Sequence, residues 1–199
     1  MKNIIFIFTL LFACNVNAQS SQNIKTVETY LNTLENMSAK FVQTASNGNV
    51  SDGILKIAKP NKIRMEYNDP TSVLIVGDGD FIVYYDKELD QTTHINYDDI
   101  PASLILANDI KIDGKQIKVV DFYQDAGITS ISLQYLKNDS VGPIKLIFEN
   151  SPMELKQWSI VDPQGVEILV SLYDVQKDVK FDDNTFKLNN KKKKLKYKK

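Results

Sequence analysis

His94 is the only histidine in the 199-residue chain, and the groups that could catalyse a reaction are correspondingly few. A metal site with several histidine ligands is impossible, and a Ser-His-Asp arrangement would have to recruit this one residue. The run Thr92-Thr93-His94-Ile95-Asn96 is typical of a strand, so we expect a structural or exposed imidazole. The sequence also lacks a nucleophile elbow, a phosphate loop and a zinc-protease motif.

Pairs of acidic residues are the remaining candidates for chemistry. Paired carboxylates cleave glycosidic bonds only where both face one cleft at a set separation. Here each pair lies beside turn residues, where aspartate accepts main-chain hydrogen bonds, and a calcium site at 77–80 lacks the five or more oxygen ligands it needs. We therefore predict no enzyme and no metal site, with a secreted hydrolase as the alternative. The pairs are Asp78 with Asp80, Asp98 with Asp99, and Asp182 with Asp183.

The first eighteen residues have the pattern of an export signal. Lys2 precedes ten apolar or nearly apolar residues at 4–13, and Val16 and Ala18 stand where signal peptidase accepts small residues. A helix of ten residues rises about 15 Å, half of a bilayer's hydrocarbon core, and is a poor membrane anchor. We therefore predict a signal peptide over 1–18 and an exported, soluble protein that begins near Gln19.

Cys14 leaves a second possibility open. Residues 11–14 are Leu-Phe-Ala-Cys, which resembles the signal at which a cysteine is lipidated and becomes the mature N-terminus, although Phe12 is bulky for it. If cleavage follows Ala18, the mature chain has no cysteine and therefore no disulfide and no thiolate. Mass spectrometry of the mature N-terminus separates the cases, since it would show either Gln19 or acylated Cys14.

The net charge of −1 hides an uneven distribution. Residues 187–199 hold eight lysines and no acid; without them and Lys2, 15 basic residues face 25 acidic ones, so the body carries about −10. An acidic body repels phosphates, which disfavours nucleic acid as a partner. We expect 189–199 to be a flexible, solvated lysine tail. Contact with anionic lipid or an acidic partner is the alternative, at about 1 kcal/mol per lysine near a surface.

Residues 19–188 have the pattern of one mainly β domain with a few helices. Ile24, Val27, Leu31, Leu34 and Met37 recur at helical spacing and predict an amphipathic helix over 21–37. A series of about eleven short strands predicts an antiparallel meander that curls into a barrel or half-barrel. The expected strands are 40–46, 51–58, 62–67, 73–77, 80–86, 90–96, 116–124, 127–136, 143–150, 153–161 and 165–174.

A short apolar segment interrupts the strands. Residues 100–107 are Ile-Pro-Ala-Ser-Leu-Ile-Leu-Ala, preceded by Asp98 and Asp99 as possible caps, and Pro101 suits a first helical turn. We predict a short helix here that is buried or lines a cavity.

The order and spacing of several motifs resembles the outer-membrane lipoprotein carrier (LolA) family. The resemblance covers roughly 24–186 and is strongest over 38–106. It implies an incomplete antiparallel β-barrel of about eleven strands, closed by a helical lid around an apolar cavity. The matching residues are Phe41-Val42-Gln43, Gly53-Ile54-Leu55, Lys59-Pro60-Asn61, 67–70, 74–79, Tyr84-Tyr85-Asp86, Leu89-Asp90-Gln91 and 101–106.

The resemblance also implies a function. Family members are periplasmic chaperones that take acylated lipoproteins from an inner-membrane transporter, shield the acyl chains, and pass them to an outer-membrane receptor, without a cofactor. We expect the same of this chain, as a monomer. Two alternatives stay open: a membrane-anchored receptor of the same fold, if Cys14 is lipidated, and an envelope β-protein with a filled core, in which an apolar dye would find no cavity.

The predicted site follows from the strands of this half-barrel. Successive side chains point to opposite faces of a strand, so Ile63, Met65 and Tyr67 share one face. A filled core and a cavity use the same residue types, so composition alone does not separate them. We expect the acyl chains to contact Ile63, Met65, Leu74, Val76, Phe81, Val83, Leu104 and Leu106.

A latch is implied by the resemblance alone. Many family members have an arginine before the proline of the first strand turn, where it binds carbonyl groups of the lid helix and holds the empty cavity closed. Lys59 occupies that place here, and Arg64, the only arginine, lies five residues further on. Lysine lacks the planar fork of arginine, so a latch at Lys59 should be weaker or differently arranged. An exposed lysine at a strand end is the alternative.

Overall fold

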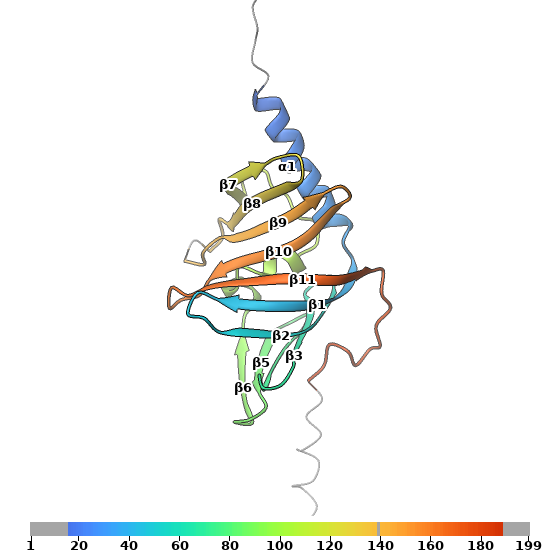
Figure 1. Cartoon of the computed structure of the whole chain (residues 1–199), viewed down its shortest axis with the longest axis vertical. Coiled ribbons are helices and arrows are strands. Elements are labelled where there is room, and N and C mark those ends of the chain that lie inside the picture. The colour runs from blue at the N-terminus through green and yellow to red at the C-terminus, as the bar shows by residue number, and fades with distance from the viewer. Residues whose placement is uncertain (1–15, 139, 189–199) are drawn as a thin grey trace, which may run out of the picture.

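The computed structural model describes residues 16–138 and 140–188 (Figure 1). Cys14, most of the predicted signal peptide and the lysine tail lie outside these residues. In chain order the elements are α1 (Val16–Thr33), β1 (Asn36–Ala45), β2 (Val50–Ala58), β3 (Lys62–Tyr67), β4 (Val73–Asp78), β5 (Ile82–Asp86), β6 (Gln91–Ile95), the 3-10 helix η1 (Tyr97–Asp99), α2 (Ser103–Leu106), β7 (Ile117–Gln124), β8 (Ile128–Tyr135), β9 (Ile144–Asn150), β10 (Met153–Val161) and β11 (Glu167–Lys177).

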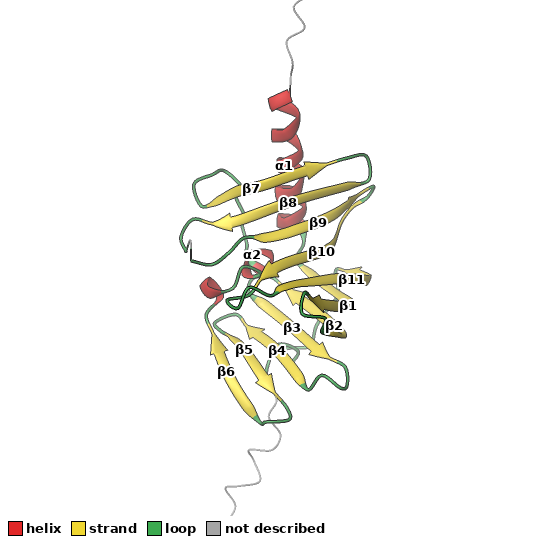
Figure 2. Cartoon of the chain, turned by 60° about the vertical axis from the view of Figure 1, so that its left-hand side comes forward, coloured by secondary structure: helices red, strands yellow, loops and turns green. Residues whose placement is uncertain are grey.

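The eleven strands form one antiparallel sheet in the order β6-β5-β4-β3-β2-β1-β11-β10-β9-β8-β7. Strands that are consecutive in the chain pair with each other, except β6 and β7, which form the two edges. The pairing of β1 with β11 joins the two halves. The sheet therefore curls strongly without closing (Figure 2), which confirms the predicted incomplete barrel and the predicted series of strands.

Helix α1 packs on the concave face of the half formed by β7–β10. Val27 and Leu31 are fully buried, and the Tyr30 ring meets Phe148 of β9 edge-on, with 5.4 Å between ring centroids. The Tyr30 hydroxyl accepts a 3.0 Å hydrogen bond from the main-chain N–H of Leu155 in β10. Figure 2 shows the helix behind these strands.

The predicted end of this helix is wrong. Instead of reaching Met37, the helix ends at Thr33, and Met37 lies in β1, where it pairs with Ile57 of β2 and Lys177 of β11. Met37 is buried all the same, at 1% exposure. The apolar spacing therefore identified a buried residue correctly but could not tell a last helical turn from a first strand residue.

Residues 97–112, which we call the lid, connect the β6 edge to the second half of the sheet. All four residues of α2 are buried, as expected, but the helix is shorter than predicted. It begins at Ser103 after Ala102, which offers no side-chain cap, while Asp98 and Asp99 lie in η1. The Ser103 hydroxyl instead donates to the carbonyl of Ile100 at 2.7 Å, which closes the turn that enters the helix.

The packing of α1 yields a stability prediction. Leu31→Ala removes a fully buried side chain from the interface with the sheet, and we expect it to lower the free energy of unfolding by about 2–5 kcal/mol. Thr29→Ala, at an exposed position two residues earlier, should change it by less than about 0.5 kcal/mol. Urea unfolding of both variants measures the difference, and equal effects would show that α1 does not belong to the core.

Candidate functional site: an apolar cavity beneath the lid

A cavity of about 270 Å³ lies between the lid and the concave face of the sheet. One wall comes from β3–β6, the opposite wall from β1, β10 and β11, and the roof from the lid. None of the lining residues carries a charge at neutral pH. They are Gln43, Ile63, Met65, Tyr67, Ile75, Ile82, Tyr84, Ile95, Ile100, Ala102, Ser103, Leu106, Trp158, Ile160, Ile168 and Val170.

The two ends of the cavity differ in exposure. Ile63 and Met65 on β3, and Leu106 of the lid, form a deep end in which each residue is less than 9% exposed. At the other end Tyr84 is 37% exposed, and Gln43, Ile160 and Ile168 are half-buried. We call this second end, defined by Gln43, Tyr67, Tyr84, Ile160 and Ile168, the mouth.

Three of the predicted site residues line this cavity. Ile63 and Met65 project from β3, and Leu106 closes the roof. Tyr67, which shares their face, lines the cavity as well. That these residues hold an acyl chain stays a prediction.

Three other predicted residues lie on the opposite face of the sheet, so their predicted place in the cavity is wrong. They are Leu74, Val76 and Val83. In β4 it is Ile75 that pairs with Met65 and Tyr84 and faces the cavity, whereas Val76 pairs with Arg64 and Val83 on the outer face. Leu74 shares that outer face. Both Leu74 and Val76 are nonetheless buried.

The C-terminal segment 178–188 lies against this outer face. It is tied to Arg64 of β3, whose Nη1 donates to the carbonyl of Thr185 at 3.4 Å. Phe186 is 7% exposed and meets Phe181 edge-on at 5.3 Å. Strand β4 is therefore apolar on both faces because both are covered, and alternation alone could not tell which face bounds the cavity.

The predictions for Phe81 and Leu104 are also wrong. Phe81 lies in the turn before β5, is 49% exposed, and its ring contacts that of His94 on the outside, with 6.5 Å between centroids. Leu104 of α2 is 1% exposed and packs in the core instead of lining the cavity. The helical turn of α2 directs Leu106 to the cavity and Leu104 away from it.

Sequence reasoning missed the second wall of the cavity. Trp158 and Ile160 of β10, with Ile168 and Val170 of β11, lie about one hundred residues from β3 in the chain and reach the cavity only through the β1–β11 pairing. A local signal existed for Ile75 and Tyr84, since simple hairpin register places Ile75 opposite Met65 and Tyr84 opposite Ile75.

The lid is fastened to the deep end of the cavity by hydrogen bonds. The Asn61 N–H donates to the carbonyl of Leu106 at 3.0 Å, and the Tyr97 hydroxyl donates to the carbonyl of Asn61. Gly77 makes room for this hydroxyl, because a Cβ there would collide with it. The far end of the lid is held by α1, since the Asn32 side chain exchanges two 2.8 Å hydrogen bonds with the main chain of Ile110.

Lys59 lies beside this lid attachment and reaches α1. Its Nζ donates to the carbonyl of Leu31 at 2.6 Å, and its main-chain N–H donates to the carbonyl of Glu35 at 2.8 Å. Burial lowers the pKa of the Lys59 amine to about 8, because no carboxylate among the described residues offsets the lost hydration. Lys59 thus hydrogen-bonds α1 and the residues just after it, and among the described residues it makes no hydrogen bond to the lid segment 100–107.

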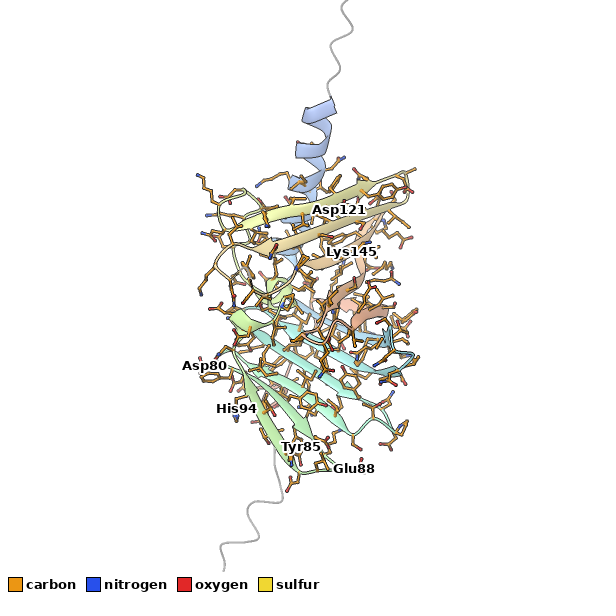
Figure 3. All side chains as sticks on the ribbon, turned by 90° about the vertical axis from the view of Figure 1, so that its left-hand side faces the viewer. Asp80, Tyr85, Glu88, His94, Asp121 and Lys145 are labelled. Atoms are coloured by element: carbon orange, nitrogen blue, oxygen red, sulfur yellow. The ribbon has the colours of Figure 1, made fainter. Side chains whose placement is uncertain are left out.

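The candidates for chemistry lie outside this cavity. Figure 3 shows His94 and Asp80 on the outer surface of the β4–β6 region, and His94 is exposed on the edge strand β6. Asp78 Oδ1 accepts main-chain hydrogen bonds from Asp80 and Phe81 at 3.0 and 3.2 Å, and Asp182 does the same for Asn184, as expected of turn residues. Within 16–138 and 140–188, no three histidine, cysteine or acidic side chains gather as metal ligands would.

Helices in the described ranges are too short or too polar to span a bilayer.

Solved structures share the architecture. A LolA superfamily protein from Nitrosomonas europaea superposes with a TM-score of 0.50 at 9% identity, covering 84% of this chain and 97% of that one. A DUF1329 family protein from Desulfovibrio piger gives a TM-score of 0.50 at 10% identity, covering 84% and 96%. At such identities the likeness concerns the fold alone.

Sequence comparisons are more specific. An uncharacterised protein of Rickettsia prowazekii is 24% identical over 96% of this chain and 89% of its own length. An outer-membrane lipoprotein carrier protein of Chromobacterium violaceum is 27% identical over 76% and 89%, and one of Nitrosospira multiformis is 34% identical over 54% and 55%. Residues 32–189 match the family described as outer membrane lipoprotein carrier protein LolA. That match spans most of the chain and every strand of the half-barrel, and the protein belongs to the LolA family.

Proposed function

We propose that the protein is a periplasmic chaperone that binds the acyl chains of lipoproteins and carries lipoproteins from the inner to the outer membrane. The observation that carries this proposal is the uncharged, apolar cavity beneath a hydrogen-bonded lid. The family and the names of the relatives support it. Its partners would be a lipoprotein-releasing transporter in the inner membrane and a lipoprotein receptor in the outer membrane.

The physics of such a carrier requires no reaction. Removing an acyl chain from water stabilises it by about 0.8 kcal/mol per CH₂, so a dry apolar cleft supplies the affinity and no cofactor is needed. The cavity of about 270 Å³ lies just below the range of roughly 300–1,000 Å³ that is usual for ligand pockets. A closed state would account for this small volume, and a whole acyl chain would then enter only when the lid moves.

A release assay tests the carrier role. Coexpressed with a lipoprotein in spheroplasts, the protein should release that lipoprotein in soluble form. Ile75→Glu places a carboxylate on the cavity wall, which the acyl chain would have to desolvate, so we expect about tenfold less release or lower. Ile54→Glu is the matched control, because Ile54 is exposed on the outer face of the neighbouring strand β2.

Each outcome of this assay decides a separate point. A wild-type protein that releases no lipoprotein would make the carrier role wrong. Equal release by Ile75→Glu and Ile54→Glu would place the cargo outside the cavity.

We further propose that Lys59 acts as the latch of the closed state. Its ammonium group is half-buried and bound to the Leu31 carbonyl of α1, while Asn61, two residues on, holds the lid. The Lys59 side chain thus links α1 to the strand turn that anchors Leu106. Opening the cavity by separating α1 and the lid from this turn would return Nζ to water.

This latch predicts a pH dependence with a definite sign. In the closed state the pKa of Lys59 is about 8, and in an open state Nζ would regain the ordinary value of 10.5. Below pH 8 both states bind the proton; above it the open state binds more protons, so rising pH favours closure. Binding of an apolar dye to the wild-type protein should therefore weaken from pH 7 to 9.5.

Variants isolate the contribution of Lys59. Lys59→Leu should abolish this pH dependence and alter cargo uptake and release, whereas Lys56→Leu, on the outer face of β2, should retain the wild-type profile. A Lys59→Leu profile that matches the wild type would contradict the latch.

A further inference from the structure

The mouth of the cavity carries polar groups that a purely apolar carrier would not need. Gln43 of β1, Tyr67 of β3 and Tyr84 of β5 meet there, whereas the deep end at Ile63, Met65 and Leu106 is apolar. A ligand that enters through the mouth therefore passes polar groups first and apolar groups later.

Tyr67 holds the Gln43 side chain in one orientation. The Tyr67 hydroxyl donates to Gln43 Oε1 at 2.8 Å, and the Tyr67 ring is fixed edge-on against Phe41, with 5.0 Å between centroids. Tyr67 is 8% exposed, and burial raises the pKa of its hydroxyl, so it remains a donor at physiological pH. The carboxamide oxygen of Gln43 is thereby occupied.

The carboxamide nitrogen of Gln43 is left without a partner. Nε2 carries two N–H donors, and no described residue accepts from them. The atom is not sealed inside the protein either, since the described part of the chain contains no buried side-chain polar atom that lacks a partner. A donor that is accessible, oriented and unpaired at the entrance of an apolar cavity is suited to an acceptor on the ligand.

We propose that Gln43 Nε2 binds the carbonyl oxygen of a bound acyl chain and so fixes the depth at which the chain sits. This inference rests on the proposed carrier function and deepens it. The wall from Ile63 to Tyr67 is about 13 Å long, at about 3.3 Å per strand residue, which is shorter than an extended palmitoyl chain. The part of the chain nearest its carbonyl would therefore lie along this wall, and the methyl end would extend past Leu106 once the lid has moved. Its carbonyl then lies at the mouth, beside Gln43, and its polar head group remains outside.

Binding of matched lipopeptides tests this contact. The probes are a peptide whose S-glyceryl cysteine carries two palmitoyl esters, and the same peptide with two hexadecyl ethers, which lack the carbonyl oxygens. Each competes with an apolar fluorescent dye for the purified full chain. The measured quantity is the ester-to-ether affinity ratio of the wild type divided by that of Gln43→Leu, because this quotient cancels the greater apolarity of the ether.

We expect this quotient to lie between about two and ten, the contribution of one neutral hydrogen bond. The ether affinity should be the same in both proteins, which shows at once that Gln43→Leu is folded. Gln157→Leu is the matched control, because Gln157 of β10 donates to Ser171 Oγ at 2.9 Å, away from the cavity, and should retain the wild-type ratio.

Failure of this inference is distinct from failure of the proposed function. A quotient of one, with both lipopeptides bound and no loss of affinity for the amide-linked peptide described below, would overturn the Gln43 contact and leave the carrier role standing. No binding of either lipopeptide would contradict both. A third peptide, palmitoylated only through its N-terminal amide, shows whether the bound carbonyl belongs to an ester or to an amide: a loss of affinity in Gln43→Leu for this peptide alone would assign the contact to the amide.

Discussion

The pairing of β1 with β11 is the constraint on which the cavity depends. It runs from Met37 opposite Lys177 to Ala45 opposite Ile168, with one register shift between Ser38 and Lys40. Through this pairing, strands from the beginning and the end of the chain become neighbours. The wall formed by β3–β6 then faces the wall formed by β10 and β11. Because such a non-local pairing brings ends together across more than one hundred residues, its loop-closure entropy must be offset by the core that it completes. Phe41, Val170 and Leu172, all nearly fully buried, are part of that core.

Local pattern explains why the strands were predictable and why half of the site was not. Each strand is bounded by turn residues and alternates in polarity, so its extent depends on near neighbours. The face that a strand presents to the cavity depends instead on what covers the other face. For β3 the outer face holds Arg64 and Glu66, and the inward residues Ile63 and Met65 were evident from the sequence. For β4 the outer residues Leu74 and Val76 are apolar and buried as well, beside Arg64, where the C-terminal segment is attached, so alternation in polarity does not identify the face toward the cavity. The wall from Trp158 to Val170 required knowledge of the β1–β11 pairing, which no local pattern contains.

The closed state is held by few interactions, and this suits a carrier. At the deep end the lid is attached through Asn61, which bonds to Leu106 and Tyr97, and each such bond contributes about 0.5–1.5 kcal/mol net. Burying a single CH₂ group of a ligand contributes about 0.8 kcal/mol. A few buried methylene groups therefore balance the loss of the two hydrogen bonds through Asn61, so an entering acyl chain can release this end of the lid. The Lys59 hydrogen bond to Leu31 is one more weak interaction of this kind, because the desolvation of the ammonium group limits how much it stabilises the closed state.

Affinity and orientation then come from different parts of one cavity. The deep end holds no polar group that could distinguish one acyl chain from another, so its contribution grows with buried length alone. Orientation needs a directional interaction. The mouth can supply one without burying an unpaired polar group in the closed state, since Gln43 and Tyr84 are partly exposed to water there. A single neutral hydrogen bond at this position sets the depth of the chain yet adds little to the energy of release. A carrier that must surrender its cargo to another protein gains from that division, because a stronger, charged contact at the mouth would hold the lipoprotein against transfer.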